Sequence, residues 1–237
     1  MNSQDAATQV LRLIAAEVPK LRSEPNALAK SFAAAGLMRS CALLRGMLVL
    51  DSAGLSELTG ILARQHWETW LVSLYALLGG EDAIRAVAAD NVYWRRKLEN
   101  SLKLEPGHQS KWPGTVVKLN YRALSDCVLK LLEDRGEPTA GPVPGVTGYD
   151  ITYSFQSTMS LHANVSTITP HIAYGPDAWS VTADAPPPLS DQLLTPVLHT
   201  VHLAQYAFKE FGLAADALEA VATELIGSQS SPKPGGV

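Results

Sequence analysis

The sequence lacks the motifs that carry most recognisable enzyme chemistry. No Walker A loop, glycine-rich dinucleotide loop or HExxH pair occurs in its 237 residues, and neither Ser157 nor Ser160 lies in a GxSxG or SxxK context. Cysteine is scarce: Cys41 and Cys127 lie in helical apolar patterns and make no metal spacing. We therefore expect no metal and no other cofactor, and we expect both thiols to be buried and reduced.

Long apolar runs and a strong net charge are also absent. No segment reaches the roughly 18 uninterrupted apolar residues of a membrane span, and the nearest, CALLRGMLVL, contains Arg45. The formal net charge of −4 argues against a surface built for nucleic acid. The N-terminus is acidic and amphipathic, without the basic start of a secretion signal. These features predict a soluble, cytoplasmic protein that binds no membrane.

Strand-type alternation is missing as well, because every sustained apolar period is close to the 3.6 residues of a helix. The spacing predicts helices at about 3–21, 27–50, 55–78, 81–104, 116–133, 149–169, 191–211 and 213–226. We expect an all-α fold, a single bundle of seven or eight helices in one domain over residues 1–227, followed by a disordered tail, 228–237. The Gly- and Pro-rich segments 135–148 and 170–190 are predicted to be irregular.

The helix predicted at 55–78 is apolar on nearly every side, which is typical of a helix buried at the centre of a bundle. Arg64 and Glu68 lie four residues apart on one of its apolar stripes, together with Leu71 and Tyr75. Charged side chains at a buried position must be paired, or used by a ligand or a reaction. An intrahelical ion pair and a functional site both fit this pattern.

A second polar group lies in the helix predicted at 149–169. His162 shares an apolar stripe there, while Tyr153 and Ser157 belong to a run of hydroxyl side chains that is dense for a helix interior. The histidine can be a packed core residue or a general base. Because a bundle turns apolar stripes toward one another, we predict that it joins the charged pair in one buried polar cluster.

This layout resembles a bacterial all-helical family, the domain-of-unknown-function family 5677. In that family a long helix leads into an Arg-x-x-x-Glu helix, and a Tyr…Ser…His segment follows downstream. The matching residues here are Arg64 and Glu68 in ARQHWE, and Tyr153, Ser157 and His162 in YSFQSTMSLH. The resemblance covers roughly residues 27–171. It implies a helical fold and this choice of site residues, and it implies no activity.

One basic stretch contains aromatic residues: Tyr93, Trp94, Arg95, Arg96 and Lys97. Aromatic side chains can stack on bases while cations hold phosphates. A solvated helix face is the commoner explanation of such a stretch. Nucleic acid is therefore a partner that fits but is not favoured.

Three histidines fit structural roles better than metal binding. His199 and His202 lie on one helix face, as metal ligands could, but no Cys or carboxylate motif accompanies them. We expect them to be packed or solvated. His66 lies beside Trp67, on the side of its helix away from the charged pair, and is predicted to lie in a helix interface.

These observations favour a ligand-binding or interaction module with an internal polar pocket. The partner would be an unidentified small molecule or protein, and Arg64 would hold an anion. The predicted ligand-binding residues are Arg64, Glu68, Tyr153, Ser157 and His162.

Two alternatives stay open. The first is a hydrolase, phosphodiesterase- or ribonuclease-like, in which Glu68 or His162 is the general base and Arg64 stabilises developing negative charge. The second is a purely structural or oligomeric scaffold, for which a homo-oligomer would use exposed Trp and Leu residues. The sequence does not decide whether the protein is an enzyme.

Overall fold

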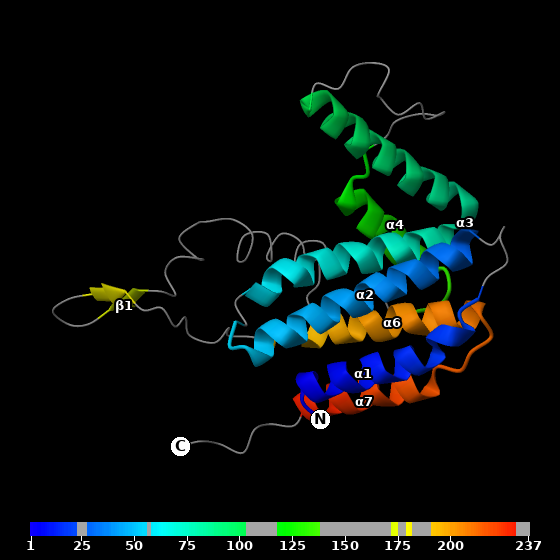
Figure 1. Ribbon diagram of the computed structural model, residues 1–237. Helices are drawn as coiled ribbons and strands as arrows, with labels where there is room; N and C mark the ends of the chain where they lie inside the picture. Colours follow the sequence, from blue (N-terminus) through cyan, green and yellow to red (C-terminus); the bar gives the residue numbers. More distant parts are fainter. Residues whose placement is uncertain are drawn as a thin grey trace.

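The computed structural model describes residues 1–22, 28–55, 58–102, 118–137, 172–174, 179–181 and 191–230 (Figure 1). Helices make up nearly all of this part of the chain. They are α1 (Ser3–Glu17), α2 (Leu28–Ser52), α3 (Thr59–Ser101), α4 (Tyr121–Glu133), α6 (Leu194–Glu210) and α7 (Asp216–Ser230), with a 3-10 turn, η1 (Val18–Lys20), after α1. The all-α prediction is confirmed. The count of seven or eight stays a prediction, because the helix expected at 149–169 lies outside the described residues.

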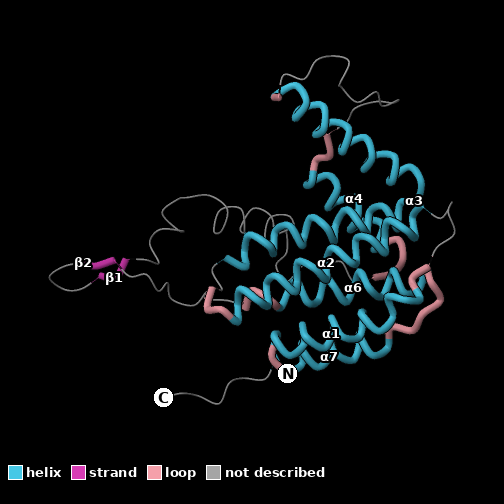
Figure 2. The backbone as a smooth tube through the Cα atoms, in the orientation of Figure 1, coloured by secondary structure: helices cyan, strands magenta, loops and turns pink. Residues whose placement is uncertain are grey.

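One short pair of strands lies in a segment that the sequence predicted to be irregular (Figure 2). β1 (Ile172–Tyr174) and β2 (Trp179–Val181) are antiparallel, with Ile172 opposite Val181 and Tyr174 opposite Trp179. β-branched and aromatic residues favour strands. Three residues are too few to show the two-residue alternation of a strand, so the sequence pattern did not predict these strands.

The most enclosed helix is α6, not the predicted central helix at 55–78. α6 contacts α1, α2, α3 and α7, and Figure 1 shows it between the α2–α3 layer and the α1–α7 pair. Its buried residues are Pro196, Val197, Thr200, Val201, Leu203, Ala204, Ala207 and Phe208. Only the last two residues of α6, Lys209 and Glu210, are charged. The helix can therefore be surrounded without burying a charge.

α3 joins the two helices predicted at 55–78 and 81–104 across a sharp kink. Gly80 has φ 67° and ψ −150°, a conformation that only glycine adopts without strain. Before the kink, Ala63, Trp67 and Leu74 are buried, whereas Ile61 is 38% exposed. The first part of α3 therefore has one buried side and one exposed side, and it is not buried on every side. After the kink, the second part leaves the bundle beside α4 (Figure 1).

The helix ends agree with the predicted positions in outline. Asn2, not Ser3, caps α1 by accepting a hydrogen bond from the Asp5 amide at 2.8 Å. Ser3 instead donates to the carboxylate of Asp191, which ties the start of α1 to the start of α6. α7 continues to Ser230 and so includes the first three residues of the predicted tail.

The two cysteines differ in environment. Cys41 is a buried free thiol, and burial raises its pKa to about 11. Cys127 is exposed on α4, so the prediction of two buried thiols is wrong for this residue. Leu124 and Val128 occupy the buried side of the same turns and leave Cys127 on the outer face.

Among the described helices, α2 is long and apolar enough to cross a membrane by length and composition. Core helices of soluble proteins meet the same criterion, and 33% of the most apolar part of α2 is buried inside the protein. The predicted localisation stays a prediction.

α2 and α3 approach each other closely at Gly36. A Cβ atom at this position would lie 2.0 Å from Ser73 Oγ and 2.7 Å from Ser73 Cβ. The Ser73 hydroxyl donates to the Thr69 carbonyl oxygen at 2.6 Å, which holds it in place. A second glycine of α2, Gly46, is less restricted, because its added Cβ would meet only the methyl end of Leu62 at 3.0 Å.

We predict that Gly36→Ala lowers the free energy of unfolding by about 1–3 kcal/mol through overpacking, although alanine is the better helix former by about 1 kcal/mol. Gly46→Ala is the matched control and should be neutral or stabilising, because Leu62 can move. Adding Ser73→Gly to Gly36→Ala should recover part of the loss. Urea unfolding of the variants tests this, and equal effects of the two alanine changes would contradict the close contact.

Candidate functional site

Arg64 and Glu68 form an ion pair on the first part of α3. Arg64 Nε lies 3.1 Å from Glu68 Oε1, and the two side chains are 19% and 17% exposed. The sequence correctly placed the two residues together. Both side chains are largely buried but remain partly accessible, so a ligand can reach them from solvent.

Two cavities adjoin this pair. The larger has a volume of about 710 Å³ and the smaller about 370 Å³. Both are lined by Gln65, Glu68 and Tyr121, so they meet at these three residues. Arg64 lines the larger cavity. The charged pair therefore lies at the walls of these cavities rather than inside the bundle core.

The larger cavity is shaped by the chain that leads into α4. Asp90, on the second part of α3, accepts a hydrogen bond from the Leu119 amide at 2.7 Å. Asn120 then caps α4 by accepting from the amides of Arg122 and Ala123. These bonds fix the segment that carries Lys118 on the rim of the cavity that Arg64 also lines.

Trp94 forms an aromatic wall of the larger cavity and is 44% exposed. The ammonium groups of Lys97 and Lys118 lie 5.0 and 5.5 Å from the centre of its ring, within the range of cation–π contacts. Tyr93 packs edge-on against the same ring, with 5.3 Å between centroids. Of these two lysines, only Lys118 lines the cavity.

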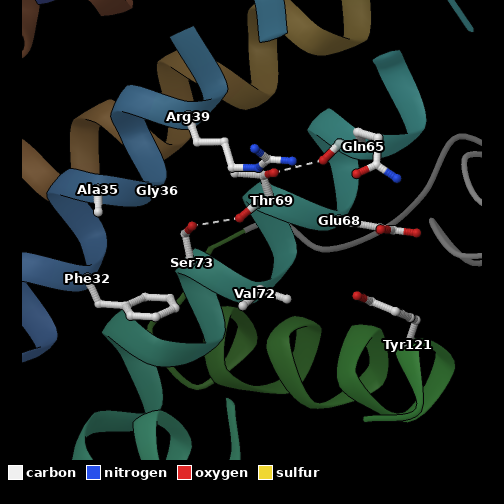
Figure 3. A pocket seen from close by; sticks show the side chains of 10 residues that line it. All are labelled: Phe32, Ala35, Gly36, Arg39, Gln65, Glu68, Thr69, Val72, Ser73 and Tyr121. Atoms are coloured by element: carbon white, nitrogen blue, oxygen red, sulfur yellow. Dashed lines mark hydrogen bonds between the residues drawn. The ribbon is translucent and has the colours of Figure 1, made fainter. Parts of the chain in front are cut away.

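Figure 3 shows the smaller cavity between α2 and α3, with Tyr121 at its end. α2 contributes Phe32 and Arg39, and α3 contributes Glu68 and Thr69. Glu68 and Tyr121 lie at one end of this cavity, and Phe32 lies at the other. Its walls are mainly uncharged, apart from one arginine and the shared carboxylate.

The charges that line the two cavities are unbalanced. Among the described residues they are Arg39, Arg64, Lys118 and the carboxylate of Glu68. Three cations and one anion in a partly enclosed space give a positive potential, which low-dielectric walls strengthen. The arrangement can hold an anion without a metal.

The structure tests part of the predicted site. Arg64 and Glu68 lie together as expected, whereas Tyr153, Ser157 and His162 lie outside the described residues. Arg39, Lys118 and Tyr121 were not predicted as site residues. Tyr121 and Arg39 come from two other helices, α4 and α2, so no local pattern connects either residue to Arg64.

The basic stretch at 93–97 is not a uniform cationic face. Arg95 Nε bonds Glu99 Oε1 at 3.2 Å, and Glu99 is nearly buried. Trp94 lines the larger cavity. This arrangement ties the stretch to the larger cavity more closely than the sequence suggested.

A separate polar network crosses the bundle core, as predicted for His66 in a helix interface. His66 is fully buried, and its Nε2 lies 2.8 Å from Thr200 Oγ1 on α6 and 3.1 Å from Ser40 Oγ on α2. Thr200 donates its one hydroxyl hydrogen to the Pro196 carbonyl oxygen at 2.9 Å. His66 Nε2 must therefore carry the proton.

His199 and His202 continue this network along α6. His199 stacks on Trp70 with 4.3 Å between ring centroids, and its ring is 6.3 Å from that of His66. His202 Nε2 lies 3.0 Å from Glu137 Oε2, and Tyr206 donates to the same carboxylate. The described part of the chain contains no group of three His, Cys, Asp or Glu residues placed to hold a metal.

Comparison of the chain with protein-family models, with curated proteins and with solved structures gives no match. The resemblance to family 5677 therefore stays a prediction.

The buried histidines predict an acid-sensitive fold. Burial lowers the pKa of His66 from 6.5 to about 3. Burial, followed by the neighbouring His66 and His202, lowers the pKa of His199 well below its ordinary value, although part of its ring stays accessible. Both folded-state pKa values lie below the unfolded value, so the unfolded chain binds more protons. The stability that the two neutral histidines contribute is fully present above about pH 6.5 and is lost as the pH falls below this value.

We expect the free energy of unfolding to fall between about pH 7 and pH 5, with up to about 1.4 kcal/mol per pH unit from each histidine. His66→Gln keeps an amide donor for Thr200 but cannot titrate, so it should reduce this slope by about one proton. Denaturant unfolding of both proteins at several pH values measures this slope. A slope that His66→Gln leaves unchanged would contradict the assignment.

Proposed function

We propose that this protein is a ligand-binding module that holds a small anion in the larger cavity, with Arg64 and Lys118 as the anion-holding groups. The observation that carries this proposal is the excess of cationic over anionic side chains around two adjoining cavities. Charge-assisted hydrogen bonds from arginine and lysine to oxyanions are among the stronger polar contacts in proteins.

Side chains, rather than backbone amides, would supply the contacts. The start of α4 points its positive dipole end toward the residues that line the cavity, which favours an anion there. The amides of Arg122 and Ala123, however, are already bonded to the Asn120 side chain, and the amide of Leu119 to Asp90. The N-terminal end of α4 therefore contributes positive electrostatic potential, and the side chains of Arg64 and Lys118 contribute the hydrogen bonds.

Glu68 would regulate this site by competing with the ligand. Its carboxylate engages Arg64 at 3.1 Å and occupies one of the donors that an incoming anion needs. It also repels that anion directly. Glu68 therefore holds the guanidinium in place before binding and weakens the binding itself.

The two alternatives respond differently to a change at Glu68. A hydrolase with Glu68 as general base loses its activity when the carboxylate becomes an amide. A purely structural pair responds to the change only through stability. An anion-binding module binds its anion more tightly. Tyr153, Ser157 and His162 stay predicted contributors to the pocket.

The test is the binding of inorganic phosphate, measured by isothermal titration calorimetry on the full chain. Glu68→Gln should raise the affinity about three- to tenfold, since removing one repulsive charge contributes roughly 1 kcal/mol at a partly exposed site. Arg64→Gln and Lys118→Ala should each lower it by a similar factor. Arg85→Ala is the control, because Arg85 pairs with Glu81 and Asp82 and lines neither cavity.

Two results would contradict the proposal. One is that phosphate fails to bind the wild-type chain. The other is that it binds the Arg64 and Lys118 variants as tightly as the wild type.

A further inference from the structure

We infer that the natural ligand is a small aromatic phosphate monoester of the nucleoside monophosphate type, with its phosphate at Arg64 and Lys118 and its planar ring against Trp94. This inference rests on the proposed anion-binding function and specifies the ligand class of the same cavity. Volume, charge and the position of the tryptophan support it.

The volume exceeds what a bare anion requires. Cavities for whole organic ligands span roughly 300–1,000 Å³, and the larger cavity, at about 710 Å³, lies within that range. A phosphate ion alone would contact only the part of the wall that carries Arg64 and Lys118. The remaining wall, which includes Trp94 and Tyr121, needs an organic group to cover it.

The charge favours a dianion over a monoanion. Among the described residues, the cations Arg64 and Lys118 and the carboxylate of Glu68 line the larger cavity, and Arg39 lines the smaller one beside it. A phosphate monoester carries about −1.5 to −2 charges near neutral pH, whereas a carboxylate or a phosphodiester carries −1. The monoester therefore attracts both cations of the larger cavity more strongly than a monoanion does.

Trp94 lies where a ring attached to that phosphate would stack. It lines the cavity with Arg64 and Lys118, and the Lys118 ammonium lies 5.5 Å from its ring centre. A lysine can move from the aromatic face to a phosphate oxygen and leave that face to the ligand's ring. Tryptophan is a strong stacking surface for planar groups, and stacking tolerates different bases.

A nucleic-acid strand fits this site less well than a free monomer. The cavity is bounded by both parts of α3 and by the chain that enters α4, which enclose one compact ligand. Along the neighbouring basic stretch, Arg95 is bonded to Glu99 at 3.2 Å. Part of the cationic row that a strand would need is therefore already neutralised.

Isothermal titration calorimetry of the full chain with adenosine 5′-monophosphate, adenosine and inorganic phosphate tests the inference. The monophosphate should bind at least about tenfold more tightly than either fragment, because stacking and charge pairing then act together. Trp94→Ala should lower affinity for the monophosphate about tenfold and leave affinity for inorganic phosphate unchanged. Trp94→Phe keeps an aromatic face and should retain most of the affinity for the monophosphate.

Lys97→Ala is the matched control. Lys97 also lies over the Trp94 ring, at 5.0 Å, but it does not line the cavity. Its removal should leave the affinity for the monophosphate nearly unchanged. An equal loss in Lys97→Ala and Trp94→Ala would overturn the placement of the ligand inside the cavity.

The outcomes separate this inference from the proposed function. If inorganic phosphate binds in an Arg64-dependent manner but the monophosphate binds no more tightly, the ligand class is wrong and the anion site stands. If neither binds, both fail. Tight binding of a 5′-phosphorylated oligonucleotide, with weak binding of the monomer, would overturn the choice of a free small molecule.

Discussion

The close contact of α2 with α3 at Gly36 and Ser73 determines how these two long helices pack. A side chain at Gly36 would overlap Ser73, so the two helices can pack at this distance only because the glycine has none. Both residues also line the smaller cavity. With α3 held against α2 on this side, its Arg64 and Glu68 positions face the α4 side, where the larger cavity forms.

Within the described residues, the core behind this contact has no uncompensated charge. α6 lies between the two helix layers, and its buried polar group Thr200 bonds His66 and its own Pro196 carbonyl oxygen. Burial keeps His66 neutral at ordinary pH, so the interior is stable without an ion pair. Arg64 and Glu68, two charged residues at intermediate depth, are at the cavity wall, where a ligand can use them.

Local features were predictable from the sequence. The helical period located the described helices to within a few residues, Gly80 marked the break in α3, and the four-residue spacing brought Arg64 to Glu68. Features set by contacts between distant segments were not. Arg39 reaches the site through packing of α2 on α3, and Lys118 reaches it through the bond between Leu119 and Asp90. Neither contact produces a periodic pattern in the sequence.

The error about the central helix has a similar cause. The stretch at 55–78 contains three aromatic residues and α6 contains two, yet enclosure depends on how many helices surround a segment. Ile61, on the predicted apolar stripe, is 38% exposed, whereas α6 contacts four helices, α1, α2, α3 and α7. Packing between distant segments sets the number of neighbours, and a periodic pattern does not record it.

Arg64 and Lys118 are proposed to hold an anion within the larger cavity. A crystal structure of the protein with tungstate, a phosphate analogue located by its anomalous scattering, tests this proposal. We expect a tungstate ion within hydrogen-bond distance, about 2.7–3.2 Å, of the Arg64 guanidinium and the Lys118 ammonium. Tungstate bound only at the surface arginines, with the cavity free of anomalous signal, would contradict it.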